Sequence, residues 1–123
     1  MCSSDLGIPL TFEVLGEPPK LSGPGIGVIA QSGAMAGTIR YALTGKGLPV
    51  SCVVSTGNEA DLDFSDFARY LLDDEGTTVI AGFVEGFKNA RKFIEVAKLA
   101  AERGKPIVLI KIGRSDLGKR AAS

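Results

Sequence analysis

Four short apolar segments alternate with three longer segments whose apolar residues recur at helical spacing, and this alternation is the feature that most constrains the fold. The apolar segments are typical of buried β-strands and cover residues 27–31, 50–55, 77–85 and 106–112. Strands that alternate with helices form parallel sheets through right-handed crossovers, and such sheets are covered on both faces. We therefore predict an α/β fold, namely a flavodoxin-like open parallel sheet with helices on both faces, truncated before its last αβ unit.

The three segments between the strands are predicted to be amphipathic helices. They cover residues 32–47, 63–74 and 88–104. Ser32 and Asp63 are suitable N-caps, Gly45 or Gly47 would end the first helix, and Gly104 would end the third. The apolar residues expected to face the sheet are Met35, Ala36, Ile39 and Leu43 in the first helix, Phe64, Phe67, Ala68, Leu71 and Leu72 in the second, and Ala90, Phe93, Ile94, Ala97 and Ala101 in the third.

The chain is predicted to contain an N-terminal segment and linker, residues 1–23, and one α/β domain, residues 24–123, that is incomplete at its C-terminal end. The stretch 7–25 contains four of the six prolines, which is typical of loops, and a short edge strand is expected at 11–15. Residues 1–6, "MCSSDL", are either a frayed N-terminus or a translated sequencing adapter, and we leave them out of the fold prediction.

Composition excludes several classes of function. Lys plus Arg and Asp plus Glu balance at 14 each, so no basic surface for nucleic acid is expected. No apolar run approaches the ~20 residues of a membrane span, and there is no secretory signal, so we expect a cytoplasmic protein without a membrane partner. The chain contains no histidine, which rules out a histidine-based triad or zinc site among these residues, and we expect no metal site.

The places where the four predicted strands end are the natural search area for a site, because ligands of open α/β sheets bind at the carboxyl ends of the strands. With Gln31, Gly57, Glu85 and Gly113 as markers, the separations are 26, 28 and 28 residues. Small and polar residues therefore recur in register along one edge of the sheet.

Two of these strand ends carry groups with a chemical use. Ser32, Gly33 and Ala34 would begin a helix, whose free N–H groups and positive dipole end favour an anion such as phosphate. The alternative is a serine N-cap with a tight-turn glycine. Glu85 could accept a hydrogen bond from a protonated imidazole. The alternative is a helix-capping or surface glutamate.

The other two strand ends are less specific. Asn58 could donate an amide hydrogen bond toward the edge of the sheet, while Asp61 and Asp63 are expected to be helix caps. The last loop carries basic residues that would either bind phosphate or be solvated: Arg114, Lys119 and Arg120.

Four stretches in order carry a resemblance to a known family: "GIGVIAQSGAMAGTIRYAL", "VVSTGNEADLDFSDFARYLLDD", "VIAGFVEG" and "KPIVLIKIGRSDLGKRAAS". Together they resemble the middle domain of the ADP-forming (NDP-forming) acyl-CoA synthetases, which include acetate–CoA ligases and are relatives of the succinyl-CoA synthetase α subunit. The resemblance covers residues 24–123. It implies a flavodoxin-type domain of an acid–thiol ligase that interconverts acyl-CoA, phosphate and ADP with free acid, CoA and ATP through a phosphohistidine.

The resemblance also implies roles for individual residues. Ser32, Gly33 and Ala34 would hold the transferred phosphoryl group, and Glu85 would bond the imidazole. The remaining positions are Gly57 and Asn58 on the substrate side, and Gly113, Arg114 and Ser115 in the loop that leads to the histidine, which is expected just beyond Ser123.

For the complete enzyme the resemblance implies CoA, ATP or ADP, and Mg²⁺. It also implies a CoA-binding Rossmann domain upstream and an ATP-grasp domain downstream or on another subunit. We expect these 123 residues to bind none of the cofactors alone and to be inactive alone. One alternative is a regulatory, synthetase-like ligand-binding domain of a GNAT-type protein lysine acetyltransferase. Another is a flavodoxin-type domain for a different anionic ligand.

Overall fold

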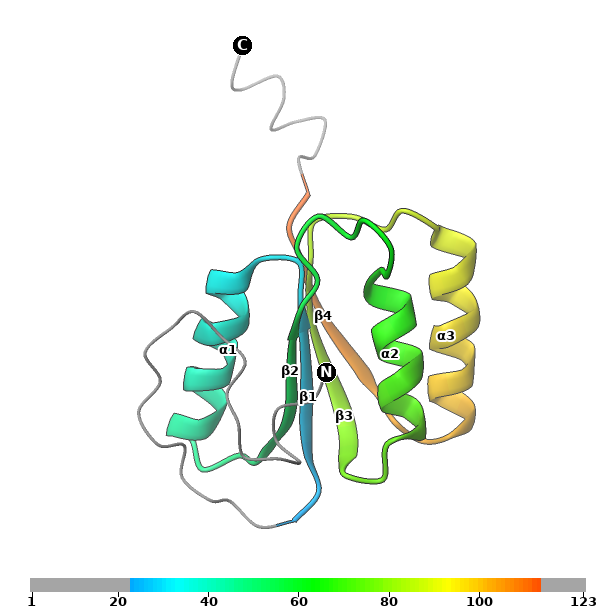
Figure 1. Cartoon of the computed structure of the whole chain (residues 1–123). Coiled ribbons are helices and arrows are strands. Elements are labelled where there is room, and N and C mark those ends of the chain that lie inside the picture. Colours follow the sequence, from blue (N-terminus) through cyan, green and yellow to red (C-terminus); the bar gives the residue numbers. More distant parts are fainter. Residues whose placement is uncertain (1–22, 114–123) are drawn as a thin grey trace.

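The computed structural model describes residues 23–113, which form one four-stranded parallel sheet and three helices (Figure 1). In chain order the elements are β1 (Gly25–Ala30), α1 (Gly33–Gly45), β2 (Val50–Ser55), α2 (Phe64–Asp73), β3 (Thr77–Val84), α3 (Ala90–Glu102) and β4 (Ile107–Lys111). The strand order is β2-β1-β3-β4, which is the order of flavodoxin-like folds. The predicted α/β fold with a parallel sheet is therefore confirmed.

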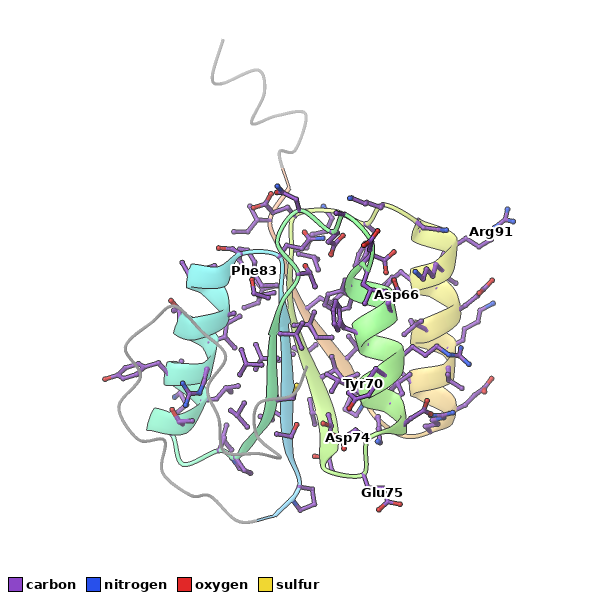
Figure 2. The ribbon with its side chains drawn as sticks, viewed as in Figure 1. Asp66, Tyr70, Asp74, Glu75, Phe83 and Arg91 are labelled. Atoms are coloured by element: carbon purple, nitrogen blue, oxygen red, sulfur yellow. The ribbon has the colours of Figure 1, made fainter. Side chains whose placement is uncertain are left out.

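Helices cover both faces of the sheet. Figure 1 shows α1 on one face and α2 and α3 side by side on the other. Phe83, labelled in Figure 2, belongs to the small core under α1, with Ala30 and Ala36. The larger core lies between the sheet and the α2–α3 layer and includes fully buried Phe64 and Leu71.

Two glycines let the α2–α3 layer approach the sheet closely. A Cβ atom on Gly27 would lie 2.6 Å from Leu71 Cδ1, and one on Gly82 would lie 2.6 Å from the Phe64 ring. Real Cβ atoms do not come this close to carbon atoms, so a larger residue would force the helices away from the sheet. The two glycines therefore set the separation of the layers.

Two elements start two residues away from their predicted first residue. β1 begins at Gly25 rather than at residue 27, because its first residues pair with β2 and β3. α3 begins at Ala90 rather than at Lys88, because Asn89 is its N-cap and accepts a hydrogen bond from Lys92 N.

The predicted inner face of α3 was wrong by about one position. Val96 and Ala100 are buried, with Phe93 packed beside them, whereas Ile94 is 52% exposed and Ala101 is exposed. The faces predicted for α1 and α2 are confirmed, with Ala36 buried in α1. The α3 sequence is rich in alanine, so two neighbouring stripes have similar hydropathy and packing against α2 chooses between them.

The ends of the four strands lie along one edge of the sheet, as predicted. Backbone hydrogen bonds join them: Thr56 N donates to Ala30 O, Gln31 N to Phe83 O, and Ile112 N to Val84 O. The edge strand expected at 11–15 lies outside the described residues. In the part of the chain that the structure describes, no helix is long and apolar enough to cross a membrane.

Candidate functional site at the carboxyl edge of the sheet

An open cleft of about 450 Å³ lies at the carboxyl edge of the sheet. It lies at the ends of β1, β2 and β3, where the chain leaves β1 toward one face and β3 toward the other. This is the topological switch point of the sheet, where ligands of such folds bind. The cleft is lined by Gln31, Gly57, Asn58, Glu59, Glu85, Gly86, Phe87 and Lys88.

The side chain of Gln31 joins three loops of the cleft. Its Nε2 donates to Gly86 O over 2.7 Å and to Glu59 Oε1 over 3.1 Å. Its Oε1 accepts from Glu85 N at 2.6 Å and from Gly86 N at 3.3 Å. The end of β1 is thereby tied to the loops that follow β2 and β3.

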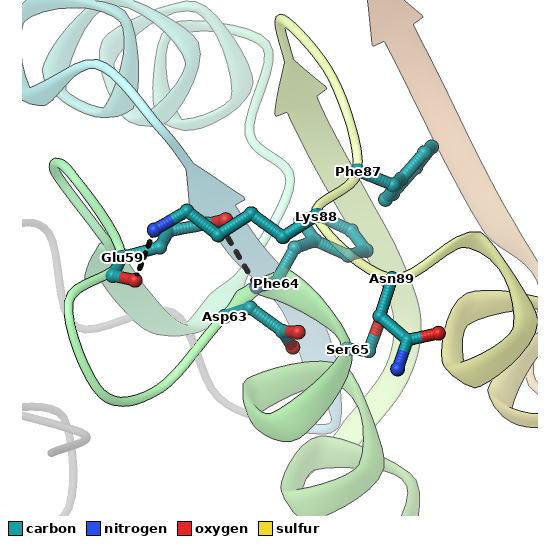
Figure 3. Close-up of a pocket in the computed structure, with 7 residues that line it drawn as sticks. All are labelled: Glu59, Asp63, Phe64, Ser65, Phe87, Lys88 and Asn89. Atoms are coloured by element: carbon teal, nitrogen blue, oxygen red, sulfur yellow. Dashed lines mark hydrogen bonds between the residues drawn. The ribbon is translucent and has the colours of Figure 1, made fainter.

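Glu59 is a buried acidic residue at the base of the cleft, with 6% of its surface exposed. Besides Gln31, its Oε1 accepts from Thr56 Oγ1 at 3.0 Å and from Phe64 N at 3.0 Å. The bond to Phe64 N, drawn in Figure 3, satisfies a free amide at the start of α2. Glu59 has a φ of 52°, in the left-handed region that is uncommon for residues other than glycine.

Lys88 and Phe87 form the wall of the cleft on the β3–α3 side. Lys88 Nζ donates to the backbone carbonyls of Asn58 and Glu59, so it ties the β3–α3 loop to the β2–α2 loop; Figure 3 shows the bond to Glu59. The ring of Phe87 stacks on Phe93 with centroids 4.0 Å apart. One side of the cleft is therefore held by a cation and backed by an aromatic cluster.

The Glu85 carboxylate is exposed at the cleft, directly after β3. Its backbone N–H is bonded to Gln31, but within the described residues its side chain makes no hydrogen bond or ion pair. A carboxylate in this situation is free to accept a hydrogen bond from an incoming donor.

The first turn of α1 begins beside Gln31 on the same edge. Ser32 is the N-cap, and its Oγ accepts from Met35 N at 3.5 Å, as predicted. The N–H groups of Gly33 and Ala34 make no hydrogen bond within the described residues, and both residues are exposed. Ser32, Gly33 and Ala34 are not among the residues that line the cleft, and they border it through Gln31.

The structure brings part of the predicted set together. Gly57, with a φ of +55°, and Asn58 line the same cleft as Glu85. Gly113 follows β4 and is exposed. The other loop positions, Arg114 and Ser115 together with Lys119 and Arg120, lie outside the described residues.

An ion-pair cluster joins the N-terminal ends of α2 and α3. Asp63 caps α2 in a capping box with Asp66, as predicted, whereas the structure gives Asp61 no part in the cap. Lys92 Nζ lies 2.6 Å from Asp66 Oδ1, and this hydrogen bond is the main reason why the pKa of Asp66 is lowered and that of Lys92 is raised.

Sequence reasoning missed three cleft residues: Gln31, Glu59 and Lys88. The sequence analysis uses Gln31 only to mark the end of a strand, although a single amide side chain at a strand end could have indicated a cleft residue. The local sequence around Glu59 does not indicate burial, because the buried carboxylate is bonded by Gln31 from another loop and by Phe64 N. Lys88 was placed in a helix, although the Asn at position 89 is a strong N-cap residue and marks a loop before it. Among residues 23–113 no group of three potential ligand side chains could hold a metal ion.

Comparison with known proteins defines the class. The model of the succinyl-CoA ligase-like flavodoxin domain matches residues 23–123. The chain therefore belongs to the family of succinyl-CoA ligase-like flavodoxin domains. The predicted resemblance to ADP-forming acyl-CoA synthetases is confirmed by the relatives and solved structures described next.

Three relatives illustrate the enzymes in which such domains occur. Trans-feruloyl-CoA synthase FCS1, from a prokaryote of unknown identity, is 41% identical over 94% of this chain and 16% of its own length. The α subunit of ADP-forming acetate–CoA ligase II from Pyrococcus furiosus is 42% identical over 80% of this chain and 21% of its own length. ADP-forming acetate–CoA ligase from Methanocaldococcus jannaschii is 42% identical, over 85% and 14%. The chain thus spans about a fifth or less of these relatives.

Solved structures agree with this family. The dinucleotide-forming acetyl-coenzyme A synthetase 1 of Candidatus Korarchaeum cryptofilum superposes with a TM-score of 0.72 at 36% identity, covering 86% of this chain and 23% of that protein. The same synthetase has also been solved in complex with phosphate and ADP.

Proposed function

We propose that this chain is the flavodoxin-like domain of an ADP-forming acyl-CoA ligase, and that its cleft receives a phosphorylated histidine during turnover. In the proposed reaction, phosphate attacks the acyl-CoA carbonyl carbon and CoA leaves as the thiol. An imidazole nitrogen then attacks the phosphorus of the acyl phosphate, and the free acid leaves. The phosphoryl group finally passes from the histidine to ADP. The histidine would come from the loop that follows Ser123 in the parent protein.

Candidate residues at the ends of β1, β2 and β3 have roles in this proposal. The free N–H groups of Gly33 and Ala34, with the Ser32 cap, would hold the oxygens of the phosphoryl group at the positive end of α1. Glu85 would accept a hydrogen bond from the imidazole nitrogen that does not carry phosphorus, which orients the ring and stabilises its positive charge. Gly57 and Asn58 would line the path of the substrate.

The observation that carries the proposal is the Glu85 carboxylate, which bonds no other residue of the described range 23–113, in an open cleft bordering a helix N-terminus whose first two amides likewise bond none of these residues. Anion-binding donors and an imidazole acceptor are what a phosphohistidine requires, and they lie on neighbouring strand ends. The family of the chain supports the same reading, because its relatives include ADP-forming ligases.

The parent enzyme would supply the remaining parts. We include in the proposal a CoA-binding Rossmann domain, an ATP-grasp domain on the same or another subunit, a cytoplasmic location, and inactivity of the 123 residues on their own. Mg²⁺ would enter with the nucleotide, and we assign no metal ligand to this domain.

The test is phosphorylation of the full-length parent protein by γ-labelled ATP, measured as acid-labile, base-stable label. We expect Glu85→Gln to slow labelling by about 100-fold, which is the lower range for a positioned acid–base partner. Glu75→Gln is the matched control, because Glu75 is exposed at the opposite edge of the sheet (Figure 2).

Two results would contradict the proposal. Labelling of Glu85→Gln at the wild-type rate would remove Glu85 from the mechanism. A wild-type parent protein that takes up no label would favour the alternative of a regulatory ligand-binding domain.

A further inference from the structure

We propose that Gln31 is a positioning residue of the cleft: its side-chain amide fixes the backbone of Glu85 and Gly86 and thereby sets the direction in which the Glu85 carboxylate enters the cleft. The inference rests on the function proposed above for Glu85. It assigns to Gln31 a task in the reaction although Gln31 itself need not touch the substrate.

The hydrogen bonds of Gln31 define a single orientation of its amide. Nε2 faces two acceptors, Gly86 O and Glu59 Oε1, and Oε1 faces two donors, the N–H groups of Glu85 and Gly86. The flipped amide would place an oxygen against two oxygens and an NH₂ group against two N–H groups. All four contacts would then be repulsive, so the observed orientation is the one that the surroundings enforce.

The same four contacts leave the amide with no capacity for a ligand. A primary amide has two N–H donors and two acceptor lone pairs, and the structure uses each of them once within the protein. Gln31 therefore acts on the cleft through the backbone that it holds. The hydrogen bond of 2.6 Å from Glu85 N to Gln31 Oε1 fixes the backbone of the residue whose carboxylate bonds none of the described residues.

Glu59 anchors Gln31 in turn. Its Oε1 is fixed by Thr56 Oγ1 and by Phe64 N at the start of α2, and it is buried. The β2–α2 loop therefore restrains the backbone of Glu85 through two hydrogen bonds in series, from Gln31 to Glu59 and from Glu85 N to Gln31. Since a misplacement of about 1 Å at a reacting group can cost about 100-fold in rate, a backbone held in this way matters for catalysis.

The first experiment measures how strongly Gln31 protects the backbone amides of Glu85 and Gly86, and it does not depend on enzyme activity. In the parent protein, hydrogen exchange is followed for peptides that span the Phe83–Lys88 segment. We expect Gln31→Ala to speed exchange of the Glu85 and Gly86 amides by about 10-fold or more, because both lose their acceptor. The matched control is Glu95→Gln, an exposed position on α3. Unchanged exchange in Gln31→Ala would overturn the inference.

The second experiment is a double-mutant cycle on the rate of labelling by γ-labelled ATP. We expect Gln31→Ala to slow labelling by about 10-fold to 100-fold in the wild-type background. In the Glu85→Gln background the same change should cause no further loss, because the group that Gln31 positions has already been removed. Gln31→Met, which keeps the length of the side chain, serves if the alanine variant does not fold.

The outcomes separate this inference from the proposed function. If Glu85→Gln slows labelling while the Gln31 variants do not, or if the two losses multiply independently, the positioning role is wrong and the proposed function stands. If Glu85→Gln has no effect, the proposed function is wrong and the positioning role for the reaction is wrong with it. A fall in melting temperature with an unchanged labelling rate of folded protein would make Gln31 a purely structural tie.

Discussion

Lys92, in the first turn of α3, places its Nζ 2.6 Å from Oδ1 of Asp66, in the first turn of α2. The hydrogen bond between them is the main cause that lowers the pKa of Asp66, and it is also the main cause that raises the pKa of Lys92. The pair joins the N-terminal ends of α2 and α3, the helices that follow two of the loops lining the cleft. Both side chains are partly exposed, so the contribution to stability is that of a surface ion pair.

We expect Lys92→Met to lower the free energy of unfolding by about 1 kcal/mol near pH 7, the upper range for a surface ion pair. A carboxyl whose pKa is lowered in the folded state adds stability above its unfolded pKa of about 4, and this is lost as pH falls through the folded pKa. The difference between wild type and Lys92→Met should therefore shrink below about pH 4. Urea unfolding at a series of pH values measures it.

The control for this prediction is Lys98→Met, which removes an exposed lysine from the same helix without touching Asp66. It should change stability by less than about 0.5 kcal/mol. An equal loss in both variants, or a Lys92→Met loss that persists at acid pH, would show that the stability does not come from the ion pair.

Gly82→Ala should destabilise the domain by about 1–3 kcal/mol, the usual cost of overpacking a core. The added methyl group would lie 2.5 Å from Leu109 Cδ2 and 2.6 Å from the Phe64 ring, which is itself held by Phe87 and Phe93. Chemical unfolding gives the change. Gly45→Ala is the matched control, because no atom lies within 4 Å of a Cβ there, and it should be neutral or stabilising. Equal stability of the two variants would contradict the close packing.

Glu59→Ala should lower the free energy of unfolding by about 1–3 kcal/mol, because it leaves the buried N–H of Phe64 and the partly buried hydroxyl of Thr56 without this acceptor. Glu59→Gln keeps an oxygen in the same place and should lose less. The comparison uses unfolding by denaturant for both variants. A glutamine variant as unstable as the alanine variant would mean that the negative charge matters more than the hydrogen bonds.

Much of the fold was readable from the sequence because the signals were local. Asp63 and Ser32 are N-caps as predicted, and the strand Val50–Ser55 has the predicted bounds. The prediction was wrong for the buried face of α3. The alanines of this helix give two neighbouring faces a similar hydropathy, so Ile94 was predicted to be buried although it is exposed.

The sequence predicted where the candidate site lies but not how its side chains are arranged. The periodicity of strands and helices determined that the strand ends share one edge, and therefore that Glu85, Gly57 and Asn58 would meet there. Parallel α/β topology carries this information in the chain order itself.

What only the tertiary structure decided is how that edge is held together. Gln31 and Glu59 are 28 residues apart, and each gains its role only when the other is within hydrogen-bond distance. Hydrogen bonds between side chains of distant loops leave no periodic trace in the sequence, since they depend on distances of about 3 Å and on the orientation of single groups. The sequence by itself therefore determined which strand ends form the cleft, and packing in three dimensions determined which side chains fix its shape.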